Sequence, residues 1–285
     1  MRKPGFLAVL SIALLIFPVC SYGIQIQLKL SSGLRFIHLD EVNLGLSGWE
    51  NGIRHQGDLF PGYSFETGKA GTLRSGFDFE AELLFSFSRW LGLGLSGGYV
   101  YASLDEEETR LSLRQDSALY VYARPTKVSA NTFLISGYLS LPMGQKFSIH
   151  ARAGLGVILA RYASREAFRS AADSRFSYLR YDKAKARDSI YLGGFGLSYA
   201  FEPNLGFFLE AFFEPAKVGG LSGENLGGEK GTLYSFEEYR PDLDFWQAKM
   251  QVLAEQPAGA NVRDVREAAI DFSGYSIKIG VILRF

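Results

Sequence analysis

Histidines close to carboxylates are the residues of this chain best suited to acid–base chemistry. The sequence contains three His, and two of them are followed closely by acids, His38 by Asp40 and Glu41, and His55 by Asp58. An imidazole with a carboxylate partner can act as a general base or activate a nucleophile. A His in a connecting segment is more often simply solvated, so we expect no catalytic residue. With one Cys and three His, we also expect no metal site and no cofactor.

Charged residues that alternate with large apolar residues form a second set. Alternation puts the two kinds on opposite faces of a strand, so the charged faces would meet if the strands enclosed an interior. The predicted lumen carries Lys29, Arg35, Arg152, Lys278 and Arg284 against Asp78, Glu80, Glu82, Glu210 and Glu214, with His150 nearby. Because an unpaired buried charge is strongly penalised, we predict a salt-bridge network there. A narrow or gated polar pathway is the alternative.

The composition of the whole chain limits its class. Its 285 residues include 30 Lys+Arg and 30 Asp+Glu, so the net charge is zero, which argues against a nucleic-acid-binding protein. The hydrophobic content of 47% and aromatic content of 14% are too high for a disordered chain. A single Cys excludes a disulfide scaffold. We therefore expect one folded domain that owes nothing to disulfides.

The first residues have the features of a secretory signal peptide. Arg2 and Lys3 precede an apolar run over residues 6–19, and the small residue Gly23 follows shortly after it. We predict a signal peptide over residues 1–23, removed by cleavage after Gly23. A retained membrane anchor is the alternative, but the run is shorter than the roughly 20 residues that span a bilayer. The residues before Cys20 do not favour a lipoprotein.

Eight later segments alternate large apolar residues with Gly, Ser or charged residues. A period of two over about ten residues predicts a β-strand and excludes an amphipathic helix. The predicted strands cover residues 24–36, 77–87, 91–101, 132–141, 147–159, 190–201, 205–214 and 275–285.

The connections between these strands alternate between short and long. Tight turns are predicted at residues 88–90, 142–146 and 202–204, and the last two contain Gly, Pro or Asn. The long connections cover residues 37–76, 102–131, 160–189 and 215–274. We predict an all-β fold, an eight-stranded antiparallel up-and-down transmembrane β-barrel over residues 24–285, with short periplasmic turns and four long extracellular loops.

The two faces of the strands distinguish this fold from a soluble barrel. Gly is a poor choice for a water-facing strand position, but it suits the narrow interior of an eight-stranded barrel. The opposite face is bulky and nearly uncharged, as a lipid-facing band must be. Its aromatic residues gather toward both strand ends, as in the girdles of membrane barrels. A soluble barrel with an apolar interior remains the competing structural interpretation.

At this level the chain resembles small bacterial outer-membrane β-barrel proteins of the OmpA-barrel, OmpX and OmpW group. The resemblance covers residues 24–285 as architecture, and it includes a final strand that carries Tyr275 and ends in the aromatic Phe285. It implies that this strand acts as an assembly signal, and that the barrel-assembly machinery and periplasmic chaperones are partners. The resemblance also places the protein in the outer membrane, and we expect a monomer.

The third and fourth long connections differ in charge. The third is basic and carries Arg165, Arg169, Arg175, Arg180, Lys183, Lys185 and Arg187, whereas residues 218–271 are acidic. The basic side chains would either pack on the acidic connection or meet lipopolysaccharide phosphates, which guanidinium groups bind well. Leu243, Trp246 and Met250 recur at helical spacing, so we predict a short amphipathic helix within residues 241–253.

Taken together, these features predict an integral outer-membrane protein with a non-enzymatic structural or surface-interaction role. Its expected partners are outer-membrane lipid and lipopolysaccharide, with no nucleic acid. The first alternative is gated transport of a small or hydrophobic ligand. The second is a lipid-modifying surface enzyme that uses His38 or His55, although no signature of a lipid A deacylase or acyltransferase accompanies them.

Overall fold

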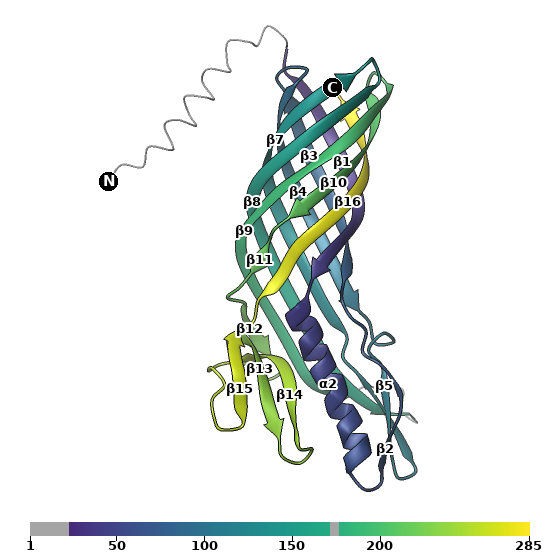
Figure 1. Ribbon diagram of the computed structural model, residues 1–285, viewed down its shortest axis with the longest axis vertical. Coiled ribbons are helices and arrows are strands. Elements are labelled where there is room, and N and C mark those ends of the chain that lie inside the picture. Colours follow the sequence, from purple (N-terminus) through teal and green to yellow (C-terminus); the bar gives the residue numbers. More distant parts are fainter. Residues whose placement is uncertain (1–22, 172–176) are drawn as a thin grey trace, which may run out of the picture.

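The computed structural model describes residues 23–171 and 177–285 and shows an all-β chain (Figure 1). Its strands form one sheet in which the neighbouring strands run antiparallel. The predicted signal peptide lies outside the described residues, except for Gly23. Across the described ranges, no helix is both long enough and apolar enough to cross a bilayer.

Eight strands of this sheet pair in a ring. Each pairs with the next one along the ring, and the last, β16, pairs with the first, β1. In ring order the strands are β1 (Gln25–His38), β3 (Ser75–Ser86), β4 (Leu91–Leu104), β7 (Thr126–Met143), β8 (Phe147–Ser170), β9 (Ser177–Glu202), β10 (Leu205–Glu214) and β16 (Ile270–Arg284). We call these eight strands the ring. They correspond in order to the eight predicted segments.

The prediction that long loops join these strands is wrong, because most of the residues concerned form further regular structure. The sheet has 16 strands, and one helix packs beside it. The additional elements are α2 (Asp40–Leu59), β2 (Tyr63–Gly68), β5 (Leu111–Gln115), β6 (Ala118–Ala123), β11 (Lys217–Val218), β12 (Ser222–Asn225), β13 (Lys230–Arg240), β14 (Phe245–Leu253) and β15 (Val262–Glu267). They extend the ring at the end opposite the tight turns, and we call this extension the crown.

Two corrections concern the crown. The basic connection over residues 160–189 is mostly strand, since β8 and β9 pair from Phe147 as far as Phe168. The helix predicted within residues 241–253 is also wrong, because β14 pairs with β13 there. In β14, Ala248, Met250 and Val252 are buried, so the segment satisfies a period of two as well as its helical spacing.

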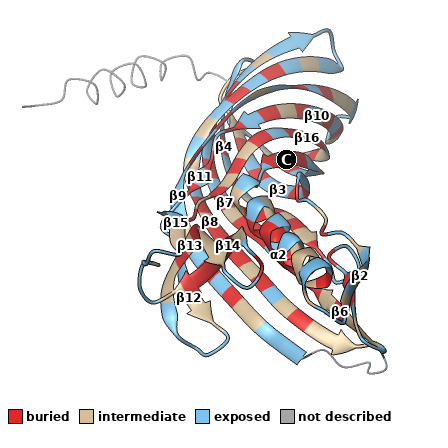
Figure 2. Cartoon of the chain, turned by 60° about the horizontal axis from the view of Figure 1, so that its bottom comes forward, coloured by how far each residue is buried: buried red, intermediate tan, exposed pale blue. Residues whose placement is uncertain are grey.

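The ring exposes its apolar face. Phe77, Phe195 and Ile279 point outward with exposed fractions of 57%, 67% and 65%, while their neighbours in sequence point inward. Inside the crown, apolar side chains from the strands pack around α2, whose inward residues are buried (Figure 2). The ring therefore has an apolar outer face, and the apolar core of the molecule sits at one end of it.

Candidate functional site

The candidate site is a group of buried charged side chains inside the ring. Lys29, Arg35, Asp78, Glu80, Glu82, His150, Arg152, Glu210, Glu214 and Lys278 are all buried. They come from β1, β3, β8, β10 and β16, where the strand period turns each of them inward. We call this group the lumen network.

Glycine on the inner face of the other strands makes room for these side chains. A Cβ atom on Gly94 of β4 would overlap the Glu82 carboxylate. One on Gly196 of β9 would lie 2.6 Å from both Glu210 Cγ and His150 Nε2. The inner glycines are therefore required because the charged side chains of neighbouring strands lie against their backbone. This explains why glycine-rich strands occur next to strands rich in charged residues.

The half of the lumen network that is nearer the crown is built around Lys278 and Arg35. The Lys278 ammonium lies 3.1 Å from Asp78 Oδ2 and 2.7 Å from Glu80 Oε2. Arg35, with none of its surface exposed, donates from Nη1 to Glu214 Oε2 at 2.6 Å and from Nε and Nη2 to the Phe272 carbonyl oxygen. Both cations thus bind more than one acceptor, as burial demands.

The turn-side half is centred on Lys29 and Glu210, which form an ion pair. His150 Nε2 donates to Glu210 Oε1 at 2.7 Å. The Lys29 ammonium also donates to the Tyr138 hydroxyl at 2.9 Å, and that hydroxyl donates to Glu82. A chain of hydrogen bonds therefore crosses the interior from one wall of the ring to the other.

Arg152 joins the two halves. Its Nη2 lies 2.5 Å from Glu80 Oε1 and 3.1 Å from Glu82 Oε1. In total, five carboxylates meet four Lys and Arg side chains and one imidazole. Such pairing is what allows charged groups to remain in a narrow interior. Arg284 is different, since no ion pair joins it to a described residue and it lines a turn-side cavity of about 430 Å³ with Lys29 and His150.

Three members of the site were missed by the sequence analysis. Tyr138 bridges Lys29 and Glu82, and the aromatic rings of Phe208 and Phe212 lie under the cations. The Lys29 ammonium is 4.4 Å from the Phe208 centroid, and that of Lys278 is 5.5 Å from the Phe212 centroid. Their inward positions within the strand period were the available signal. An aromatic face attracts a cation, so these rings help to hold the ammonium groups.

An apolar layer covers the crown end of the lumen network. It includes Val100, Val128, Ile158 and Ile190 of the ring, all at most 1% exposed. Helix α2 packs across this layer against β14, with Gly48 so close to β14 that a Cβ atom would overlap the Ala248 carbonyl. The interior therefore consists of a charged layer and, above it, an apolar one.

The histidines considered for catalysis, His38 at the end of β1 and His55 in α2, have no carboxylate partners among the described residues. His38 Nδ1 donates to the Ser273 carbonyl oxygen at 2.9 Å. His55 Nδ1 donates to the Asn51 carbonyl oxygen at 2.9 Å, and its ring stacks on Phe245. Glu41 binds Arg266 and the Ala269 amide instead of His38. The structure thus brings neither His together with the acids that neighbour it in sequence.

The basic residues of 160–189 are spread along β8 and β9. Arg165 lies over the Tyr181 ring, and Arg169 is half-buried. Arg180 pairs with Asp182 at 3.3 Å, and Lys183 pairs with Glu224 at 2.7 Å. Lys185 and Arg187 are exposed, and Arg175 lies outside the described residues.

The residues of the predicted assembly signal lie on the outer face of β16. Tyr275 is 63% exposed, and its ring lies 5.2 Å from that of Phe213. Phe285 is 78% exposed, and its amide donates to the Ile26 carbonyl oxygen at 3.0 Å. The chain therefore ends at the turn-side edge of the ring, hydrogen-bonded to β1.

Comparison with known proteins finds similarity only at the level of solved structures. No family model and no curated protein matches the sequence. A crystal structure of Ail, the attachment invasion locus protein of Yersinia pestis, in complex with the heparin analogue sucrose octasulfate, is 10% identical, covers 92% of this chain and 97% of Ail, and gives a TM-score of 0.36. A second crystal structure of Ail is 12% identical over the same shares, with a TM-score of 0.33. These similarities agree with the predicted resemblance to small outer-membrane β-barrel proteins, and at TM-scores below 0.5 they carry no argument about function.

Proposed function

We propose that the ring is an eight-stranded β-barrel that spans the bacterial outer membrane, with a non-enzymatic structural or surface-interaction role. The observation that carries this proposal is that the polar face of the ring points inward and its apolar face points outward, the reverse of a water-soluble protein. Ten charged or titratable side chains are buried inside the ring, and its outer face is a band of large apolar side chains. A water-soluble protein would gain stability from the opposite arrangement.

The outer band fits a lipid environment in its extent and chemistry. Outward residues such as Leu139, Leu155 and Phe195 are 59%, 62% and 67% exposed, and each belongs to a different strand. Exposing this surface to water would cost about 25 cal/mol per Å² of apolar area. Closure of the ring also pairs the backbone groups of its strands, and hydrocarbon tolerates no unpaired strand edge.

The layered interior favours a structural role over transport. The lumen network fills the width of the ring with paired charges, and the apolar layer together with α2 covers the network at its crown end. An eight-stranded barrel has room for little more than its own side chains. Gated transport remains the second candidate, supported by the turn-side cavity that Lys29, His150 and Arg284 line.

The crown would carry the surface interaction. In this arrangement the tight turns and both ends of the mature chain face the periplasm, and the crown faces outward. The basic outer side chains of β8 and β9 would then meet lipopolysaccharide phosphates. Delivery would require the signal peptide over residues 1–23, periplasmic chaperones and the barrel-assembly machinery, and the protein would act as a monomer.

Heat modifiability tests the proposed function. The protein in purified outer membranes is run on denaturing gels before and after boiling. A barrel that resists detergent migrates differently in the unboiled sample, and we expect this shift in the outer-membrane fraction. A soluble periplasmic protein without a shift would refute the proposal. Conductance steps in planar bilayers would favour transport, and a changed lipid A mass in cells that carry the gene would favour an enzyme.

A further inference from the structure

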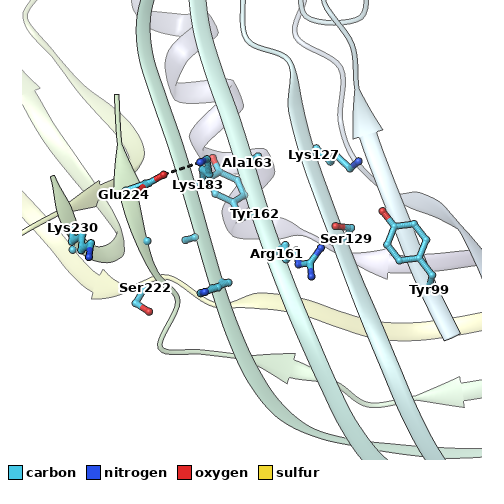
Figure 3. A pocket seen from close by; sticks show the side chains of 14 residues that line it. Tyr99, Lys127, Ser129, Arg161, Tyr162, Ala163, Lys183, Ser222, Glu224 and Lys230 are labelled. Atoms are coloured by element: carbon cyan, nitrogen blue, oxygen red, sulfur yellow. Dashed lines mark hydrogen bonds and ion pairs between the residues drawn. The ribbon is translucent and has the colours of Figure 1, made fainter. Parts of the chain in front are cut away.

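A cationic groove lies outside the ring, where the crown begins. It has a volume of about 690 Å³ and runs along β7, β8, β9 and the adjoining hairpin of β12 and β13 (Figure 3). Its charged lining consists of five cations and one carboxylate, Lys127, Arg161, Lys183, Lys185 and Lys230 against Glu224. We call it the basic groove. It includes three cations that the sequence analysis did not name, Lys127, Arg161 and Lys230.

The strand register brings these cations together on one face. Arg161 of β8 is directly opposite Lys185 of β9, and Lys185 is opposite Ser222 of β12. In the next row, Lys183 is opposite Glu224. Side chains directly opposite one another have Cβ atoms about 5 Å apart, and two like charges in that arrangement destabilise a sheet. The pair of Arg161 and Lys185 is therefore unfavourable until an anion lies between the two groups.

Two of the cations lack a partner that would neutralise them. Lys183 forms an ion pair with Glu224 at 2.7 Å, and Lys230 is directly opposite the same Glu224 in the strand register. The Lys127 ammonium lies 4.7 Å from the Tyr101 ring centroid. Arg161 and Lys185, by contrast, have no hydrogen bond or ion pair from their side chains to any residue that the structure describes, and both are exposed. The groove thus holds two donors available to a ligand.

The groove adjoins the apolar band. Tyr99 of β4 lines the groove and is paired with Asn131 of β7, and Phe133, two residues further along β7, is 57% exposed. On β8, Arg161 follows the outward Leu159 by two residues, which is about 7 Å along a strand. A bilayer headgroup layer is about 5–7 Å thick on each side. In a membrane the guanidinium would therefore lie at headgroup height, one outward position beyond Leu159.

We propose that the basic groove binds the phosphate-bearing headgroup of a lipid in the outer leaflet. Arg161 would bind the phosphate oxygens in bidentate fashion, and Lys185 would act as a neighbouring point charge. The acyl chains would lie on the apolar band below, beside Phe133, a surface that a free phosphate ion would leave unused. This proposal rests on the proposed membrane-spanning function, because only an embedded ring sets the groove at the lipid headgroups.

The test compares lipid binding by purified protein in a neutral detergent, measured by native mass spectrometry. The probes are dioleoyl phosphatidic acid, dioleoyl phosphatidylcholine and inorganic phosphate. The groove variant is Arg161→Gln with Lys185→Gln. The matched control is Lys69→Gln with Arg110→Gln, which removes two exposed crown cations that do not line the groove. At roughly fivefold per cation, the groove variant should weaken phosphatidic acid binding about 30-fold, and the control should leave it unchanged.

Three outcomes would overturn the proposal. The first is equal weakening in the groove variant and the control, which would mean non-specific attraction. The second is binding of inorganic phosphate as tight as that of phosphatidic acid, which would mean a soluble anion site. The third is that phosphatidylcholine binds as tightly as phosphatidic acid and that the groove variant weakens the binding of both lipids by the same factor. Each sample is also tested for the heat-dependent gel shift, since its absence in the unmodified protein would refute the proposed function and not the groove alone.

Discussion

Removing the Lys278 ammonium should destabilise the ring more than any change at its surface. In Lys278→Met, an apolar side chain of similar length replaces a cation that faces three carboxylates. Its Nζ lies 3.1 Å from Asp78, 2.7 Å from Glu80 and 3.8 Å from Glu214. Arg152 would still pair with Glu80, and Arg35 with Glu214, but Asp78 would keep only Arg35 at 3.6 Å. One buried carboxylate would thus lose its nearest cation.

The expected loss follows from these distances. At 3.1 Å and an effective dielectric constant of about 20, two unit charges attract by about 5 kcal/mol. Part of this gain is offset in the native protein, because burying the ammonium itself costs free energy. We therefore expect Lys278→Met to lower the free energy of unfolding by about 3–5 kcal/mol, the range for one partner removed from a buried ion pair. Adding Asp78→Asn should restore part of it, because the orphaned charge is then removed as well.

The assay is urea unfolding of the protein refolded into phospholipid vesicles, followed by tryptophan fluorescence and by the heat-dependent gel shift. Lys146→Met is the matched control, because Lys146 is exposed in the turn between β7 and β8. It should change the free energy of unfolding by no more than about 0.5 kcal/mol. The reasoning is refuted if Lys278→Met unfolds within 1 kcal/mol of the unmodified protein, or if Asp78→Asn restores nothing in the double variant.

Three further predictions concern Gly48 of α2, Asp182 of β9 and Asp242 between β13 and β14. Gly48→Ala should lower the free energy of unfolding by about 1–3 kcal/mol and speed proteolysis of the crown, because the added Cβ would overlap the Ala248 carbonyl. The control Ser47→Ala, on the exposed side of α2, should do neither. A Gly48→Ala variant that is more stable than the unmodified protein would contradict this packing. Burial raises the pKa of the Asp182 carboxyl despite the amide hydrogen bond from Val252, so its contribution to stability is greatest below about pH 4 and is lost as the pH rises. Asp182→Asn should therefore raise the urea midpoint at pH 7 and leave it unchanged at pH 3.5. Asp242→Asn should have the opposite effect and lower the urea midpoint at pH 7, because Arg240 lowers the pKa of the exposed Asp242 carboxyl. Equal changes of the urea midpoint in the two variants would contradict these two pKa directions.

The ring could be predicted because its two faces differ so strongly. On the outer face every second residue is large and apolar, as with Phe77 and Phe79 beside the inward Asp78 and Glu80. The same contrast identified the inward charges that lie together in the lumen network. Their partners could not be assigned, because pairing depends on the register between strands.

The continuation of β8 and β9 beyond the ring was missed because its outer face carries charged residues. In β8 the inward Ala160, Tyr162 and Ser164 still alternate with outward residues, but Arg161 and Arg165 replace the apolar ones. The period of two therefore persists as an alternation of charge with small residues, and this was interpreted as a loop. Only the register shows that β8 and β9 stay paired through this stretch.

Helix α2 could not be predicted from local preference, because Gly45, Gly48 and Gly52 weaken a helix. Each of these glycines faces β14, and the helix is held by that close approach instead of by its own propensity. The helix predicted at residues 241–253 failed for a related reason. Pairing with β13 satisfies the backbone of β14 along its length, and this outweighs a helical spacing of apolar residues.

The most direct test of the central claim asks whether the outer face of the ring contacts lipid. Residues 24–285 contain no Cys, so single cysteines carrying nitroxide labels can be placed at Phe195 and at Lys185, outward positions of the same strand. In vesicles, power saturation then compares collision with oxygen, which concentrates in lipid, and with a water-soluble nickel complex. We predict that the label at Phe195 collides mainly with oxygen and the label at Lys185 mainly with nickel. A label at Phe195 that is as accessible to nickel as the one at Lys185 would contradict the account.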